Sequence, residues 1–192
     1  MKRTLIAAAA ALLLPSGAAE AAPYVGVNLN ANLLDVNQAN TTTFPQSTIG
    51  GDFHAGYRFD NLNLAGELGY GTSRGEQTPD NLRINMLTGD ALYYVPIGGF
   101  LNIVLSAGMA EVNYGDSRAT YSVVQENGQT KSIRTGNTIF HGTEFDWRVG
   151  PGFSFALADG YELHLITRYQ PLSMGDRNNY SLSLSFGMNF YF

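Results

Sequence analysis

The chain has 192 residues, a formal net charge of −5 and no cysteine. Its eleven Lys and Arg residues form no basic cluster, which excludes an obvious surface for nucleic acid, so we expect no nucleic-acid partner. The lack of cysteine excludes disulfide bonds, and three scattered histidines do not have the spacing of a metal site. We therefore expect no metal and no other cofactor.

The first 21 residues have the layout of a secretory signal peptide. Lys2 and Arg3 precede an apolar run from Leu5 to Leu14, and small residues at Ala19 and Ala21 predict cleavage after Ala21. The ten apolar residues of that run are too few for a membrane-spanning helix, which needs about twenty. The sequence thus predicts an exported protein with one mature domain, residues 22–192.

A hydrophobic period of two recurs in eight segments of the mature chain and predicts eight β-strands. The segments are 25–33, 49–59, 62–71, 87–95, 101–109, 145–155, 161–169 and 180–192. On each, one face is uncharged and mostly apolar. The last segment shows this best, because every even position from Tyr180 to Phe192 is large and apolar while most odd positions are small or polar.

The opposite faces of these strands carry the ionisable residues among many Gly and Ser. Such small side chains suit a crowded interior better than an open surface. An apolar exterior around a polar lumen is the arrangement of an outer-membrane barrel, and a closed sheet satisfies every backbone group in lipid. We predict an all-β, eight-stranded antiparallel up-and-down transmembrane β-barrel with an interior polar network of Asp52, His54, Arg58, Glu67, Asp90, Asp146, Arg148, Glu162, His164 and Arg168.

The predicted connections alternate between short and long. Short turns follow the second, fourth and sixth strands, and longer connections span 35–47, 72–82, 113–143 and 172–179. Short turns are typical of the periplasmic end of such barrels and long loops of the extracellular end. We therefore expect the barrel to lie in the outer membrane of a Gram-negative bacterium, with both chain termini in the periplasm.

Two strand registers lead to specific expectations inside the barrel. Asp60-Asn61 is interpreted as a two-residue turn, which places His54 directly opposite Glu67 and predicts that they touch. A less direct register sets Arg148 opposite Arg168, so both would need a carboxylate from Asp90, Asp146 or Glu162. The lumen of an eight-stranded barrel is barely wide enough for the side chains that point into it. This favours a structural network, and a narrow channel or gate is the alternative.

Pro151 lies in the middle of the sixth predicted strand. Proline cannot donate a ladder hydrogen bond, and a closed barrel has no free edge on which to place it. The sequence therefore predicts a bulge or a locally missing hydrogen bond at this position.

Two stretches, Asp90-Ala-Leu-Tyr-Tyr-Val-Pro with the Gly-rich turn after it and the terminal Asn189-Phe-Tyr-Phe, resemble the small eight-stranded outer-membrane barrels. These are the OmpA transmembrane domain and the OmpX/Ail group, and the resemblance covers the whole mature chain. It implies outer-membrane lipid and lipopolysaccharide as surroundings and the barrel assembly machinery as a partner. In such proteins the last strand is similar to the assembly signal, which implies that role for Phe190, Tyr191 and Phe192; the alternative is that they are only lipid-facing aromatics.

Residues 119–135 are interpreted as a hairpin around Asn127-Gly128, with Tyr121, Val123 and Ile133 as further candidate surface residues. The resemblance to the OmpX/Ail group implies that it protrudes beyond the membrane. Exposed strand edges can pair with a strand of another protein. An adhesin-like role toward a host or extracellular protein is therefore the leading hypothesis, and the alternative is that the hairpin only caps the barrel.

We expect no enzymatic activity. Some small barrels cut lipid A acyl chains with a His and a Ser two residues apart on a lipid-facing strand, and the matching stretch here, residues 167–170, has Arg168 and Gln170 at those places. His141 and Thr143 have the spacing, but Thr is a poor substitute for a nucleophilic Ser, and no acid is clearly placed to orient His141. A lipid A-modifying enzyme is thus the least favoured alternative.

Overall fold

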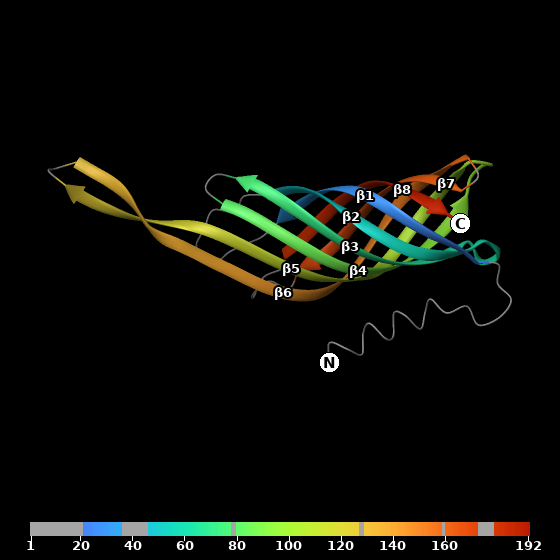
Figure 1. Ribbon diagram of the computed structural model, residues 1–192, viewed down its shortest axis with the longest axis horizontal. Helices are drawn as coiled ribbons and strands as arrows, with labels where there is room; N and C mark the ends of the chain where they lie inside the picture. The colour runs from blue at the N-terminus through green and yellow to red at the C-terminus, as the bar shows by residue number, and fades with distance from the viewer. Residues whose placement is uncertain (1–20, 36–45, 78–79, 127–128, 159, 173–178) are drawn as a thin grey trace.

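The computed structural model describes residues 21–35, 46–77, 80–126, 129–158, 160–172 and 179–192 (Figure 1). Eight antiparallel strands close into one barrel, in which each strand pairs with its neighbours in chain order and the last pairs with the first. This confirms the predicted fold. The strands are β1 Ala21–Asp35, β2 Gln46–Phe59, β3 Leu64–Gln77, β4 Asp80–Pro96, β5 Leu101–Glu126, β6 Gln129–Ala158, β7 Tyr161–Leu172 and β8 Asn179–Tyr191.

All of the predicted signal peptide except Ala21 lies outside the described residues. In the described part of the chain, no helix is long and apolar enough to span a membrane.

The two faces of the barrel wall differ as the sequence period predicts. Large apolar side chains are exposed on the outside, for example Leu29 at 68% and Phe53 at 74%. Charged side chains of the same sheet are enclosed, with Asp90 at 6% and Arg148 at 8% exposure. Exposing so much apolar surface to water would be costly, whereas an apolar band suits hydrocarbon. The outer wall is therefore the lipid-facing one.

The barrel is strongly sheared, as one hydrogen-bonded row shows. Starting at Pro23 on β1 and following directly paired residues through all eight strands, the row returns to β1 at Leu33, ten residues further along. A shear of that size tilts the strands by about 35–45° from the barrel axis. We call the end of the barrel at which β1 leads to β2 the loop end, and the opposite end, at which β2 leads to β3, the turn end. Going from β1 to β8, each row of paired residues therefore climbs toward the loop end.

Apolar side chains occupy the lumen on both sides of its polar middle. Along β4, Ile84 lies toward the loop end, Asp90 in the middle, and Leu92 and Tyr94 toward the turn end. The larger apolar cluster, on the turn side, consists of Tyr24, Ala65, Leu92, Tyr94, Val104 and Ile166. The smaller cluster, on the loop side, consists of Ile84, Ala110, Val112 and Leu172.

The turn between β2 and β3 is longer than expected, and this changes the register. Residues Asp60–Leu62 form a single 3-10 turn, and Asn63 follows in the left-handed conformation with φ 49° and ψ 35°. Asn63 donates its backbone N–H to the Asp60 carbonyl at 3.2 Å. The prediction of a two-residue turn at Asp60-Asn61 was wrong, and Leu62 belongs to the turn and not to the strand.

Because of this longer turn, the predicted pairing of His54 with Glu67 was wrong. Glu67 lies opposite Gly56, and His54 lies opposite Gly69. The two extra turn residues move the ladder by two residues, which keeps each side chain on its face but changes its partner. The expected opposition of Arg148 and Arg168 was also wrong, because Val149 pairs with Tyr169 and sets a different register.

Of the two predicted effects of Pro151, a bulge or locally missing pairing, the structure shows the missing pairing. The β6–β7 pairs Val149↔Tyr169 and Gly152↔Ile166 keep one register, and Gly150 and Pro151 between them form no ladder pair with β7. The missing pairing is confirmed, whereas the bulge of these two strands lies between Ala156 and Ala158.

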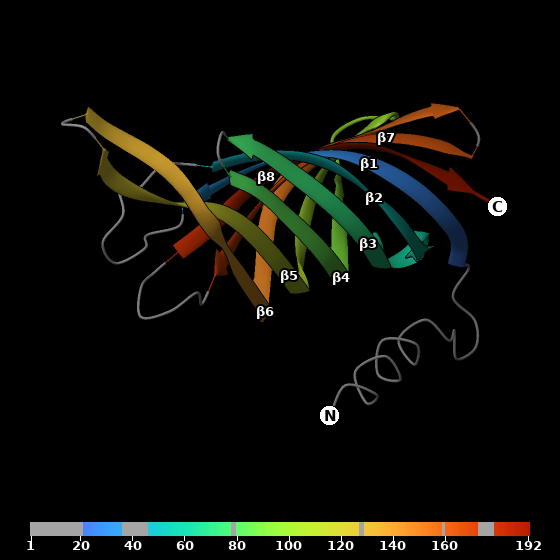
Figure 2. The same ribbon diagram turned by 60° about the vertical axis from the view of Figure 1, so that its left-hand side comes forward.

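Two of the four predicted long connections are mostly strand. β3 and β4 continue until Gln77 pairs with Asp80, within the predicted connection 72–82. β5 and β6 continue until Glu126 pairs with Gln129, within the predicted connection 113–143. We call the segments 116–126 and 129–140 the ribbon; it projects well beyond the other strands in both views (Figures 1 and 2).

Candidate functional site

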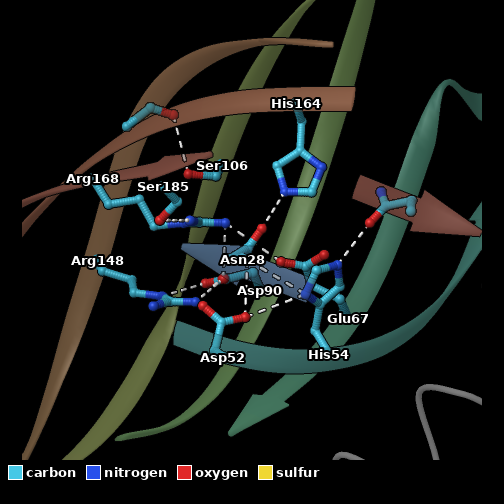
Figure 3. A network of polar contacts seen from close by, with 12 residues as sticks. Asn28, Asp52, His54, Glu67, Asp90, Ser106, Arg148, His164, Arg168 and Ser185 are labelled. Carbon is cyan, nitrogen blue, oxygen red and sulfur yellow. Dashed lines mark hydrogen bonds and ion pairs between the residues drawn. The ribbon is translucent and has the colours of Figure 1, made fainter. Parts of the chain in front are cut away.

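The centre of the lumen is built around the carboxylate of Asp90 on β4. Arg148 of β6 donates to it in a bidentate manner, with Nε to Oδ1 at 2.7 Å and Nη2 to Oδ2 (Figure 3). Nη2 of Arg168 on β7 lies 3.5 Å from the same Oδ2. Asp90 thus neutralises part of the positive charge of two buried guanidinium groups, which come from two other strands.

Glu67 on β3 supplies the second carboxylate of this cluster. Arg168 donates to Glu67 Oε1 at 3.4 Å and to Ser185 Oγ at 3.2 Å, and the Tyr24 hydroxyl donates to Glu67 Oε2 at 3.1 Å. Two arginines therefore meet two carboxylates, so the cluster is close to neutral. Such compensation matters because an unpaired buried ion costs several kcal/mol.

A second polar cluster joins β1, β2, β7 and β8. Asp52 accepts from Asn28 at 2.9 Å and from Asn30 at 2.6 Å, and it lies 3.3 Å from Nδ1 of His54. His164 Nε2 lies 2.6 Å from Asn28 Oδ1, and the two histidine rings are 5.7 Å apart. The two histidines therefore belong to one hydrogen-bonded arrangement across the lumen (Figure 3).

The second cluster continues toward the turn end of the barrel. His54 Nε2 lies 2.7 Å from Asn189 Oδ1, and Asn189 donates to Glu162 Oε1 at 3.4 Å. Arg58 donates to Glu162 Oε2 at 2.6 Å and lies with its guanidinium 4.2 Å from the centre of the Tyr94 ring. An arginine held by a carboxylate and an aromatic face thus fills the turn-side end of the lumen.

Glycines on the inner face provide the room for these side chains. A Cβ on Gly108 would collide with the Asp90 carboxylate and with the backbone oxygen of Gly89. A Cβ on Gly187 would collide with the Asn28 amide and with the backbone oxygen of Val27. The Gly-rich inner face noted in the sequence therefore serves to accommodate large polar side chains in a narrow lumen.

The ten predicted interior residues all lie on the inner side of the wall. Seven of them are buried, and Asp52, Arg58 and Asp146 are half-buried. Sequence reasoning missed the uncharged members Tyr24, Asn28, Asn30, Ser185 and Asn189, because the predicted network was limited to Asp, Glu, Arg and His. The inward positions of three alternating asparagines on β1 were the available signal.

The structure places two of the four residues considered for catalysis inside the barrel. Arg168 and Gln170 are both buried in the lumen, away from lipid. Thr143 donates its hydroxyl to Asn113 Oδ1 at 2.6 Å, and the side chain of His141 lies outside the described ones. Among the described residues, no group of three or more His, Asp or Glu is placed to hold a metal ion.

The three carboxyl-terminal residues point in different directions. Phe192 is 77% exposed, and Phe190 lies half-buried on the outer wall, 5.6 Å from the Tyr161 ring. Tyr191 faces the lumen and packs on Tyr24 with ring centres 5.2 Å apart. A lipid-facing role therefore does not apply to Tyr191, and the assembly role of the three stays a prediction.

The candidate hairpin residues lie on the ribbon or at its tip. Tyr121 pairs with Arg134, Val123 with Ser132, and Ile133 with Ser122, after a register shift at Thr120/Tyr121. Asn127 and Gly128 lie outside the described residues. β4 pairs with β5 only as far as Gly115, so beyond it, among the described pairs, the two ribbon strands pair only with each other.

Residues 4–190 match the family model described as an outer membrane protein beta-barrel domain. Neisserial surface protein A is similar in structure, with a TM-score of 0.64, 17% identity, and coverage of 88% of this chain and 97% of that one. Ail of Yersinia pestis, in complex with the heparin analogue sucrose octasulfate, has a TM-score of 0.56 and 11% identity over 90% of this chain and 99% of its own. OprG from Pseudomonas aeruginosa has a TM-score of 0.56 and 12% identity over 91% and 96%. No curated protein sequence matches the chain.

Proposed function

This chain belongs to the outer membrane β-barrel family, and on that premise we propose that it is a non-catalytic surface protein that binds an extracellular or host protein through its ribbon. The barrel holds the ribbon in the membrane. The loop ends of the strands face outward from the cell, and the turn ends and both termini face the periplasm.

The observation that carries this proposal is the ribbon, whose two strands pair, within the described part of the chain, only with each other and leave both outer edges without a ladder partner there. Its eleven β5 residues, 116–126, reach roughly 35 Å at about 3.3 Å per residue, which is far more than a headgroup layer. Unpaired strand edges present free backbone N–H and C=O groups, which an extended segment of a partner can use to add a strand. Ail is named for attachment and invasion, which agrees with a role of this kind.

The interior supports a structural role of the barrel over conduction. Both polar clusters and both apolar clusters occupy the lumen, and the arginines and carboxylates are bound to each other. Planar-bilayer recording with pure refolded protein tests this interpretation. We expect no discrete conductance; a reproducible unitary conductance would favour the channel alternative.

Deletion of residues 119–135 tests the binding proposal. Arg118 and Thr138 face each other in the ladder, so the deletion leaves them joined by Gly136-Asn137, a two-residue connection compatible with a hairpin. We expect the variant to fold, and we expect cells that carry it to lose their binding to extracellular matrix proteins. A deletion of residues 173–178, at the same end of the barrel, is the control and should keep binding. Full binding by the 119–135 deletion would contradict the proposal.

A separate measurement tests the alternative that the protein is a lipid A-modifying enzyme. Mass spectrometry of lipid A from cells with and without the gene should give the same acyl pattern. A loss of one acyl chain that depends on this protein would overturn the non-catalytic part of the proposal.

A further inference from the structure

Two arginines lie directly opposite each other on the outer wall. Arg74 of β3 pairs with Arg83 of β4, and both side chains are exposed. Like charges in directly opposed positions on one face of a sheet repel each other. Among the described side chains neither arginine has an ion pair or hydrogen bond, whereas Arg58, Arg148 and Arg168 each bind a carboxylate. Within the part of the chain whose side chains are described, this pair of cations thus has no counter-ion.

The height of this pair in the membrane follows from the shear of the barrel. Rows climb ten residues over eight strands, so they climb about four residues over three strands. Phe145 on β6 belongs to the row of Tyr70 on β3, and Arg74 lies four residues beyond Tyr70 toward the loop end. Arg74 and Phe145 therefore lie at about the same height.

Aromatic side chains mark that height as the membrane interface. Phe145 and Trp147 are about half exposed on the outer wall. Trp147, Tyr169 and Tyr180 continue around the wall, with neighbouring ring centres 5.9 and 5.7 Å apart. Aromatic girdles of this kind lie at the level of the lipid headgroups. The two arginines are thus placed where hydrocarbon gives way to phosphate.

The immediate neighbours of the pair complete a binding patch. Thr72 and Asn85 pair directly with each other on the membrane side of the arginines, and both lie on the outer face. Two ladder pairs further down, on the same face, Tyr70 and Leu87 begin the apolar wall, and Glu111 on β5 lies beside Leu87. The acids closest in sequence to the arginines are Glu76 and Asp80, whose side chains are not described. The patch offers two guanidinium forks, a hydroxyl and an amide above a surface for acyl chains.

We propose that Thr72, Arg74, Arg83 and Asn85 bind the phosphate group of a glycolipid of the outer leaflet, with its acyl chains against Tyr70 and Leu87. Guanidinium groups bind phosphate oxygens in a bidentate manner, and two of them balance the charge of a phosphomonoester. The apolar wall directly below favours a lipid over a free anion. That the site faces the outer leaflet rests on the proposed function, which places the loop ends outside the cell.

Native mass spectrometry of the refolded mature chain in detergent tests the proposal without depending on orientation. The probes are diphosphorylated lipid A, the same lipid without phosphates, and inorganic phosphate as competitor. We expect at least a tenfold preference for the phosphorylated lipid, and loss of this preference in R74Q/R83Q. The matched control K131Q/R134Q removes the same charge from the ribbon and should keep the preference.

Thermal unfolding provides the second readout. Without lipid, R74Q/R83Q should be at least as stable as the wild type, since a like-charge pair is gone; with phosphorylated lipid, only the wild type should gain stability. Equal binding by R74Q/R83Q, equal binding of the dephosphorylated lipid, or displacement by millimolar inorganic phosphate would each overturn the proposal. The ribbon deletion should bind lipid normally, so a failed adhesion test and a failed lipid test are distinguishable.

Discussion

β5 and β6 each have two parts, one in the barrel wall and one in the ribbon. Comparing these parts separates the residues that stabilise the fold from the residues that project beyond it. Inside the barrel, the residues of these strands have neighbours on β4 and β7, and Arg148 reaches Asp90. In the ribbon, the same two strands pair, among the described residues, only with each other. Stability should therefore depend mainly on the barrel part of these strands and little on the ribbon.

The largest expected effect comes from removing the carboxylate that two arginines share. In Asp90→Leu, Arg148 and Arg168 lose a partner that is itself buried, which should lower the free energy of unfolding by about 3–5 kcal/mol. Denaturant titration in lipid vesicles measures this, with the single tryptophan, Trp147 on the outer wall, as the fluorescent reporter.

The matched control for this substitution is Asp60→Asn. Asp60 also binds an arginine, with Arg58 Nε 2.8 Å from its Oδ1, but its side chain is largely exposed. Exposed pairs contribute about 0–1 kcal/mol, so the control should change stability little. Similar losses for Asp90→Leu and Asp60→Asn would contradict the view that the lumen carries the stability.

A smaller loss should follow from filling the space beside Asp90. Gly108→Ala places a methyl group against the Asp90 carboxylate and should cost about 1–3 kcal/mol through overpacking. Gly66→Ala is the control, because a Cβ there faces outward and meets no atom within 4 Å. The pair of variants is compared by urea midpoints in the same vesicles; equal midpoints would argue against a tightly filled lumen.

Restoring a donor in the barrel wall should have a modest effect of opposite sign. Pro151→Val gives β6 an N–H where pairing with β7 is missing, and one additional ladder bond stabilises by about 0.5–1.5 kcal/mol. Protection of the new amide from hydrogen exchange would show that the bond forms. An unprotected amide with unchanged stability would mean that Gly150 also prevents pairing.

The smallest effect on stability is expected from the ribbon. Deleting residues 119–135 should change the free energy of unfolding by less than about 0.5 kcal/mol, since the described ladder pairs of this segment all lie within the ribbon. In the intact protein, ribbon amides should exchange hydrogen much faster than those of the barrel part of β5 and β6. Slow exchange in the ribbon would indicate that it is held by something other than its own pairing.

The faces of the strands and the closed fold were open to prediction, whereas the partners within the lumen were not. His54 and Glu67 were both expected inside, and both are inside, but a turn of four residues in place of two separates them. In the same way, Arg148 and Arg168 do not oppose each other, although both reach Asp90 from different strands.

The amino-acid sequence by itself determined which side of each strand meets lipid, because a period of two in polarity is a local property that survives any shift of two residues. Tertiary structure alone decided which side chains touch. Contacts across the lumen depend on the length of each turn and on a shear of ten residues around the whole barrel. The shear exists only once the last strand closes on the first, so no single segment of sequence contains it.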